Sequence, residues 1–442
     1  MLFILLTVVI VLCLLAFILN NKDLMEPSVI VCISYIISIL CAVVNIKVWD
    51  INLANNTFWI ITVGTVIFIS INIIITYIIK SKYNKKYQWK QDLKVINIQY
   101  FKIILVAMFQ IIVALFYAKS VRSLAGQYGS FNDFSSMMTV YRMNTSYGTN
   151  AGVSATLNQF VKLSNVCAFV FLYVFINNIL EKSNQKRNLL NIIPVIIYSI
   201  QVILTGGRFN LLALICSAFI IYNVLWHRKN GWNRQIKIKF LFKAIIILIF
   251  VFVGFYFLKT FVGRTSKVDF ITYITSYVGG SIQLFNMYVN GPISKSSIWG
   301  KETFYSINDF LRKVGLLNIN AYIPHLEFRF SNGVMLGNVY TAYRRYIQDF
   351  GIEGMIILQS VFALFYSIFY EKIKLKFPKK KLDYSLLVYA AISYPLFMHS
   401  INDCFFSGIL SVNYLIIIIL LKLVSWFIVD IKVSFKNSLN RK

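Results

Sequence analysis

The stretch MLFILLTVVIVLCLLAFIL, residues 1–19, decides the fold class because it runs through nineteen positions without a charged side chain. An α-helix needs roughly 20 apolar residues to cross a hydrocarbon core about 30 Å thick. No basic residue precedes the apolar part, and no pattern of small residues typical of signal cleavage follows it. We therefore predict a retained first membrane span, not a signal peptide.

Ten further apolar runs of comparable length follow the first. Each run is continuously apolar instead of alternating, which favours membrane-spanning helices over the strands of a barrel. We therefore predict an all-α polytopic membrane protein with about 11 transmembrane helices. The spans are expected at residues 1–19, 28–46, 58–79, 101–121, 158–180, 190–205, 207–226, 240–262, 352–370, 384–399 and 407–429.

The composition of the 442 residues excludes a water-soluble domain. Apolar residues make up 58% and charged residues 14%, against about 45–50% and about 25% in soluble domains. The net charge of +28 lies largely in Lys-rich connections between spans, so it indicates membrane orientation and not nucleic-acid binding. The six cysteines lie in or beside apolar runs without a CxxC pair, which indicates neither a disulfide framework nor a zinc site.

Five basic segments fall on one side of the predicted bundle. That side carries 27 Lys and Arg residues, and the other side carries 16. Because positively charged loops stay in the cytoplasm, we expect the N-terminus outside and the C-terminus inside, which requires an odd number of spans. The five segments are residues 80–94, 181–187, 227–239, 371–381 and the tail from residue 430.

Two predicted external segments, 122–157 and 263–351, are too long for simple connections. Within the second, YITSYVGGSIQLFNMYV (273–289) is typical of an amphipathic or re-entrant helix on or in the bilayer. We therefore expect three parts: transmembrane helices 1 to 8 in residues 1–262, an extracytoplasmic cap in 263–351, and helices 9 to 11 with a cytoplasmic tail in 352–442.

Arginine is concentrated on the external side, where it makes up 8 of the 16 basic residues against 4 of the 27 inside. Its planar guanidinium binds carboxylate or phosphate oxygens through two hydrogen bonds. Arg208 follows Thr205, Gly206 and Gly207 at the start of a span, where small residues and free N–H groups let an anion approach the backbone. A tight hairpin with a snorkelling arginine explains the same residues equally well.

The stretch GNVYTAYRRYIQDFGIEG, residues 337–354, combines polar and aromatic side chains before another predicted span. If the stretch is helical, Tyr340 and Arg344 share one face, so that hydroxyl and guanidinium groups reach one ligand. The alternative is an aromatic belt at the membrane surface in which Asp349 pairs with an arginine. The predicted ligand-facing residues are Asn338, Tyr340, Thr341, Arg344 and Arg345.

Acid and base residues are sparse outside. His325 and Glu327, in PHLEFRF (324–330), are the first candidates for a general base, because an acceptor hydroxyl must lose its proton. Asp349 is the third candidate, and a structural role for the histidine is an equal alternative. Since no D-x-D pair occurs, the sequence predicts no metal site and no cofactor, and arginine would meet the charge of a leaving group.

Two of these stretches resemble sequence in the oligosaccharide repeat-unit polymerases, the Wzy-type O-antigen and capsule polymerases. They are TGGR at the head of one span (205–208) and NVYTAYRRYIQDFGIEG before another (338–354). The number of spans, the long late external loop and DLMEPSV (23–29) after the first span are similar as architecture. The resemblance implies a GT-C-like membrane fold.

The resemblance also implies a metal-independent glycosyltransferase of the bacterial plasma membrane. It would polymerise oligosaccharide repeat units, linked to undecaprenyl pyrophosphate, into a surface polysaccharide such as O-antigen or capsule. The lipid-linked oligosaccharide and the bilayer would be its partners, with a flippase and a chain-length regulator as candidate protein partners. The expected pyrophosphate-binding residues are Arg142 in VYRMNTSYG (140–148), Arg208, Arg264 and Arg344.

Two other functions stay open. An O-antigen ligase-type transferase, which moves finished glycan from the same carrier to another acceptor, would share the bundle, the long loop and the arginines. A lipid-linked oligosaccharide flippase or another transporter would be expected to show ionisable residues at mid-membrane depth, inverted repeats or broken helices. The sequence shows none of these three features clearly.

Overall fold

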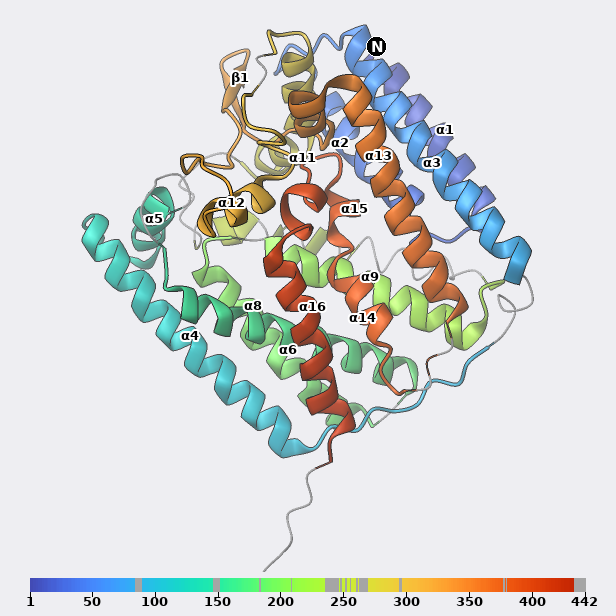
Figure 1. The fold of residues 1–442 in the computed structure, drawn as a ribbon, viewed down its shortest axis with the longest axis vertical. Helices are drawn as coiled ribbons and strands as arrows, with labels where there is room; N and C mark the ends of the chain where they lie inside the picture. The colour runs from blue at the N-terminus through green and yellow to red at the C-terminus, as the bar shows by residue number, and fades with distance from the viewer. Residues whose placement is uncertain are drawn as a thin grey trace, which may run out of the picture.

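A computed structural model of the chain places most residues in α-helices and, among the residues it describes, two short strands in one sheet (Figure 1). It describes residues 1–432 except 84–89, 146–151, 183, 208, 235–245, 247–248, 251–252, 255, 260, 262–268, 294–295, 377 and 379.

The helices and strands follow in the order in which they occur along the chain. The first half contains α1 (Leu2–Leu19), α2 (Pro27–Val44), α3 (Asn55–Tyr83), α4 (Tyr100–Tyr128), α5 (Phe134–Thr145), α6 (Ala155–Leu180), α7 (Gln185–Leu189), α8 (Ile193–Leu204) and α9 (Phe209–Asn230). The second half contains α11 (Phe270–Val289), α12 (Tyr305–Lys313), β1 (Arg329–Ser331), β2 (Val334–Gly337), α13 (Tyr343–Leu375), α14 (Tyr384–Ala391), α15 (Tyr394–Met398) and α16 (Val412–Ser425).

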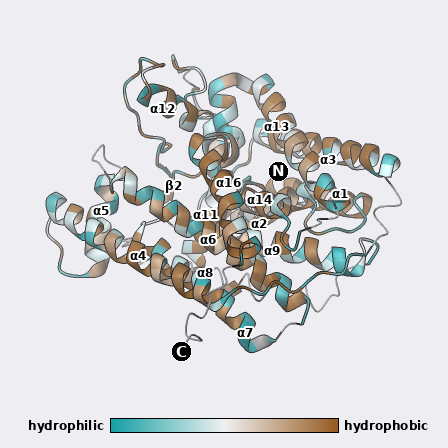
Figure 2. Ribbon diagram, turned by 60° about the horizontal axis from the view of Figure 1, so that its bottom comes forward, coloured by the Kyte–Doolittle hydropathy of each residue, from teal (hydrophilic) through white to brown (hydrophobic). Residues whose placement is uncertain are grey.

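Nine helices among the described residues are long and apolar enough to cross a membrane. Apolar residues predominate along them, and polar residues gather at helix ends and in connections (Figure 2). They correspond to predicted spans one to seven, nine and eleven, with shifted ends. The predicted eighth span, 240–262, lies mostly outside the described residues. The all-α polytopic class is therefore confirmed, while the number eleven stays a prediction.

The predicted tenth span is divided into α14 and α15. Pro395 has no N–H to donate to the preceding turn, which separates the two helices. Side chains of other helices donate to carbonyl oxygens beside the break: Ser217 Oγ donates to Ala390 O at 2.6 Å, and Tyr366 Oη donates to Ile392 O at 2.5 Å. Such pairing allows a helix to break inside a membrane bundle.

The described residues of the Lys-rich connections lie together on one face of the bundle, here called the Lys-rich face. Four contacts join the five basic segments: Gln91 N to Arg228 O (2.8 Å), Gln91 Nε2 to Pro378 O (3.3 Å), Lys229 Nζ to Glu181 Oε1 (2.8 Å) and Lys380 Nζ to Asp430 Oδ2 (2.6 Å). The basic segments that the loop charges assign to one side therefore meet on one side of the fold.

The described part of the predicted external loop, from residue 269 onward, folds as a cap over the opposite face. Residues 273–289 are helical within α11, as predicted, and this helix packs against α2 and α3. Asn286 Oδ1 accepts hydrogen bonds from Ala54 N (3.0 Å) and Thr57 Oγ1 (2.9 Å), and Ser331 Oγ donates to Trp49 O (2.6 Å). The cap is thus anchored on the α2–α3 connection.

We predict that Gly279→Ala loosens the contact between α11 and α2. An added Cβ at Gly279 would lie 2.6 Å from Cys41 Cβ and 2.7 Å from Ala42 N, so the two helices would have to separate. Overpacking of this kind lowers the free energy of unfolding by about 1–3 kcal/mol. Unfolding of the purified protein in detergent measures the effect.

Gly280→Ala is the matched control, because its added Cβ would come no closer than 3.4 Å to any neighbouring atom. We expect this variant to be as stable as the parent or slightly more stable, since alanine is the better helix former. Equal losses of stability in both variants would contradict a close approach of helices at Gly279.

Candidate functional site

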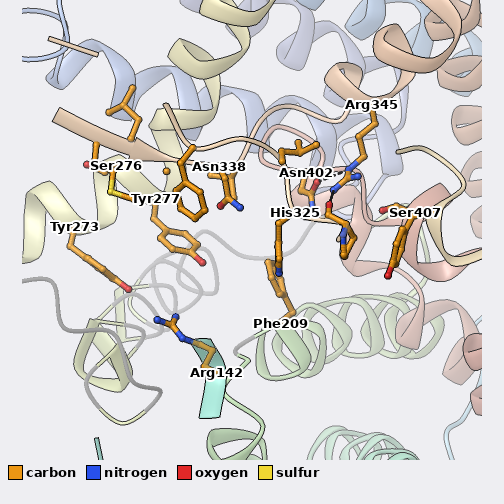
Figure 3. Close-up of a pocket in the computed structure, with 18 of the residues that line it drawn as sticks. Arg142, Phe209, Tyr273, Ser276, Tyr277, His325, Asn338, Arg345, Asn402 and Ser407 are labelled. Atoms are coloured by element: carbon orange, nitrogen blue, oxygen red, sulfur yellow. Dashed lines mark hydrogen bonds between the residues drawn. The ribbon is translucent and has the colours of Figure 1, made fainter. Parts of the chain in front are cut away.

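A cavity of about 750 Å³ lies between the cap and the bundle. Its walls come from segments that are far apart in the sequence: α5, the start of α9, α11, the start of α12, residues 324–326 and 328, residues 334–339, the start of α13 and the connection between α15 and α16 (Figure 3). Large ligand sites commonly have this size and form where several elements converge.

Several predicted site segments meet at this cavity. Arg142, His325 and Asn338 line it, and so does Phe209 at the start of α9. Gly206 adopts a left-handed backbone conformation (φ 69°), and a Cβ added there would lie 3.8 Å from Arg142 Cγ and Cδ. In the same turn, Gly207 N donates to Thr205 Oγ1 at 3.4 Å. This turn, residues 205–207 and here called the glycine turn, therefore packs against the side chain of Arg142.

The described lining contains no carboxylate, so its charged groups are basic, and polar and apolar side chains make up the rest. In Figure 3, Arg142 and Arg345 lie on opposite sides, with His325 between them, and Tyr273 and Tyr277 approach from α11. Arginine, hydroxyl and amide groups together provide donors for an anion and partners for hydroxyl groups. The remaining polar lining residues are Thr272, Ser276, Tyr305, Ser306, Asn338, Asn402 and Ser407.

Arg345 lines the cavity and fastens the cap at the same time. Its guanidinium donates hydrogen bonds to Glu302 O (3.1 Å), Pro324 O (3.2 Å) and Asn402 Oδ1 (3.4 Å). All three acceptors are neutral atoms, and Arg345 forms no ion pair within the described part of the chain. Its positive charge is therefore available at the cavity wall.

Arg344, in contrast, forms ion pairs with carboxylates of the cap. Its guanidinium lies 2.8 Å from Glu302 Oε2 and 3.1 Å from Glu327 Oε2, and it lies 4.0 Å from the centre of the Tyr288 ring. Only 5% of the side chain is exposed, and it is not one of the described cavity-lining residues. The guanidinium group of Arg344, predicted to bind pyrophosphate, is thus already paired with the carboxylates of Glu302 and Glu327.

The predicted helical spacing of Tyr340 and Arg344 is wrong, because α13 begins only at Tyr343. Tyr340 and Thr341 are nevertheless close to this helix and fully buried. Tyr340 Oη donates to Glu327 O at 3.1 Å, away from the cavity. Within the described lining, Asn338 and Arg345 are the two residues of this predicted cluster that reach the cavity.

The three predicted catalytic residues are separated by the structure. His325 lines the cavity, whereas Glu327 and Asp349 do not. Asp349 Oδ2 accepts hydrogen bonds from Glu302 N (3.0 Å) and Thr303 N (2.7 Å), so this carboxylate holds the cap backbone. His325 is therefore the candidate with access to a ligand.

The two cap glutamates differ in proton affinity. Burial raises the pKa of Glu302 above its ordinary value, although Arg344 and Arg345 act against it. Burial acts in the same direction on Glu327, but the charge of Arg344 and further hydrogen bonds outweigh it, so the pKa of Glu327 lies below its ordinary value. A carboxylate with a lowered pKa is a poor proton acceptor at neutral pH.

Two predicted site residues are not described by the structure, and four residues that line the cavity were not predicted from the sequence. Arg208 and Arg264, both predicted to bind pyrophosphate, lie outside the described residues. Sequence reasoning missed Tyr273 and Tyr277, because α11 was interpreted as a helix on or in the bilayer. It also missed the polar stretch HSINDCFFS (399–407) between two apolar runs, which places Asn402 and Ser407 in the cavity wall.

Comparison of the chain with protein-family models, with curated proteins and with solved structures finds no match. Among the described residues, no group of three or more His, Cys, Asp and Glu side chains is arranged to hold a metal ion. The site itself is therefore the basis for inferring function.

We predict that Arg344→Gln lowers the free energy of unfolding by about 3 kcal/mol, the lower end of the range for a broken buried ion pair. The reason is that Glu302, of which 19% is exposed, would lose its ionic partner inside the cap. Unfolding in detergent, together with the rate of proteolysis within the cap, measures the loss.

Arg312→Gln is the control for this variant. Arg312 also forms a 2.8 Å ion pair, with Asp309, but 27% of its side chain is exposed. Removal of a solvent-accessible pair is expected to cost less than about 1 kcal/mol. If both variants lose the same small amount, the Arg344 pairs do not hold the cap.

Proposed function

We propose that the chain is a membrane glycosyltransferase that polymerises lipid-linked oligosaccharide repeat units in this cavity. The proposal rests on one observation: Arg142, Arg345 and His325 converge at a cavity whose described lining has no carboxylate. Substrates that bring a pyrophosphate and many sugar hydroxyls need such a lining, because an anion is bound by arginine and repelled by carboxylates.

The position of the cavity supports the same reaction. It lies beneath the cap, on the face opposite the Lys-rich face. Under the positive-inside rule the cavity face is extracytoplasmic, with the N-terminus outside and the C-terminus in the cytoplasm. By the sequence resemblance, this is the face of the bacterial plasma membrane on which repeat units carried by undecaprenyl pyrophosphate are joined.

We assign pyrophosphate binding to Arg142 and Arg345, on opposite sides of the cavity. In polymerisation the donor and the acceptor each carry a lipid pyrophosphate, so two separate basic positions fit two substrates. Arg208, which follows the glycine turn behind Arg142, and Arg264 stay proposed ligands of the same kind.

In the proposed transfer, the oxygen of an acceptor hydroxyl forms a bond to the anomeric carbon of the donor. The bond between that carbon and the pyrophosphate oxygen breaks, and its electron pair leaves with the lipid pyrophosphate, whose charge the arginines stabilise. The hydroxyl proton passes to His325. Tyr273 and Tyr277 offer ring faces and hydroxyl groups to the sugars.

We assign Arg344, Glu327 and Asp349 to positioning instead of catalysis. Their charged groups bind one another or the cap backbone outside the cavity lining. In this assignment they hold residues 324–328, and with them His325, at the cavity wall.

A ligase-type transferase is the nearest alternative, because it uses the same carrier and leaving group. The surface glycans of a deletion strain distinguish the two enzymes. Single repeat units left on the surface support a lost polymerase, whereas long unattached polymer supports a lost ligase.

A lipid-linked oligosaccharide flippase is a second candidate, since α14 and α15 form a broken helix and ionisable side chains are buried near the Lys-rich face. Protein reconstituted in vesicles with the native repeat unit distinguishes the two functions. Polymer formation supports the polymerase, and movement of the unit across the bilayer without polymer supports the flippase.

We predict that Arg142→Lys lowers the rate of polymerisation about tenfold to a hundredfold. Lysine keeps the charge but loses the fork, and one charge-assisted contact contributes about 1.5–3 kcal/mol. The rate of polymer formation from a purified lipid-linked repeat unit measures the effect. Arg122→Lys, at an exposed position of α4, is the matched control and is expected to keep full activity. An unchanged rate in Arg142→Lys would remove Arg142 from the site.

A further inference from the structure

A second polar centre lies near the Lys-rich face, away from the cavity. Lys374 of α13 lies at the middle of this polar centre, and 4% of its side chain is exposed. Lys374 Nζ forms an ion pair with Glu26, lies 2.8 Å from Glu371 Oε1 and lies 3.4 Å from Asp23 Oδ2. These four residues, here called the ionic centre, connect the α1–α2 turn to α13.

The ionic centre contains more acid than base. Its three carboxyl groups are at most 4% exposed and share a single ammonium. The neighbouring Arg228 forms its own buried pair with Asp383 at 2.7 Å. With all three carboxyl groups ionised, the centre would hold two uncompensated negative charges, and each buried charge costs several kcal/mol.

The other titratable groups around the ionic centre do not supply the missing positive charge. They are Tyr370 of α13, Tyr389 of α14 and His227 of α9. Tyr370 Oη donates to Asp23 Oδ2 at 2.8 Å, and the His227 ring is stacked on Trp232 at 4.7 Å. From α3, the neutral side chains Asn72 and Thr76 donate to Glu26 (2.9 Å) and Glu371 (3.3 Å).

Hydrogen bonds and neighbouring charges distinguish Asp23 from Glu26. Asp23 accepts from Tyr370, from Asn223 Nδ2 (3.0 Å) and from Met25 N (3.0 Å), as an ionised carboxylate does. Burial opposes this ionisation, but Lys374 and these bonds outweigh it, so the pKa of Asp23 lies below its ordinary value. Burial raises the pKa of Glu26 to about 8. The attraction to Lys374 acts against burial, but repulsion from Glu371 and Asp23 offsets much of this attraction.

A separate observation also points to an exchangeable proton. Nδ1 of His227 has no hydrogen-bond partner among the described residues, although the side chain is only 4% exposed and its charge would interact with Asp23 and Lys374. The Oδ1 atoms of Asn20 and Asn223, in the same buried network, also have no donor there. A buried acceptor without a donor costs free energy, and the excess negative charge beside these atoms adds to that cost, which a proton bound in the ionic centre reduces.

We propose that the ionic centre is a proton-binding site. At neutral pH one proton resides on Glu26, so this carboxyl group is neutral beside Lys374. On deprotonation the O–H bond of the neutral acid breaks, the proton passes to water, and a further negative charge stays in the centre. The attachment of the α1–α2 turn to α13 then weakens.

The direction of the pH dependence follows from Glu26, whose ordinary pKa is 4.5 and whose pKa in the folded protein is about 8. The folded state therefore holds a proton that the unfolded state has already lost between these two values. The stability that this proton contributes is fully present below about pH 4.5 and is lost as the pH rises through about 8.

Glu26→Gln in the full-length protein tests the proposal, because glutamine is the neutral isostere of a protonated glutamate. The thermal stability of the parent in detergent is expected to fall between about pH 6 and about pH 9.5. At about pH 6 the variant is expected to be at least as stable as the parent, because the parent has already lost part of the proton's contribution above about pH 4.5. The stability of the variant is expected to stay level up to about pH 9.5. Asp383→Asn, which breaks an ionised buried pair, is the control and should lose stability at both pH values.

A second measurement follows the carboxyl group itself. Infrared difference spectra of the parent across the same pH step are expected to show the loss of a protonated carboxyl C=O band, and Glu26→Gln is expected to remove that band. The proposal is overturned if the parent shows no such band, if its stability is level with pH, or if Glu26→Gln keeps the band or is less stable than the parent at about pH 6.

Discussion

The attachment of the cap to the first two turns of α13 is the interaction on which the external cavity depends. Arg344 pairs with the carboxylates of Glu302 and Glu327, Arg345 binds the backbone of Glu302 and Pro324, and Asp349 accepts two N–H groups of the same cap segment. These contacts fix both ends of residues 302–327. Since this segment supplies the cavity wall from Tyr305 to Leu326, the site keeps its shape only while α13 holds it.

The same contacts separate positive from negative charge. Glu302 and Glu327 face Arg344, which leaves Arg345 with neutral partners at the cavity wall. Asp403, in the connection between α15 and α16, is buried and is not one of the described lining residues, and its carboxylate accepts hydrogen bonds from the backbone N–H groups of residues 405–407. A positive potential therefore remains where an anionic leaving group would need it.

The sequence predicts the membrane spans well because each span is one continuous apolar run, and even the predicted boundary at residue 352 coincides with an interruption of α13 at Gly351. It predicts the site only as a set of segments. Neighbouring helical residues point about 100° apart, so Arg344 and Arg345 face different surroundings, and only the position of the cap decides which one reaches the cavity. Likewise, Lys374 and Glu26 are 348 positions apart, and no local pattern indicates that they pair.

The interruption at Gly351 also bears on how the two polar centres are related. Its backbone (φ 69°, ψ −168°) is not helical, so the turns that hold the cap and the longer part that carries Lys374 are two rods and not one. A continuous helix would transmit a displacement at the ionic centre directly to Arg345, whereas two helical segments joined at Gly351 can change their angle there. The geometry of the cavity is therefore set mainly by the cap contacts, and a proton at the other end of α13 acts first on the α1–α2 turn that it binds.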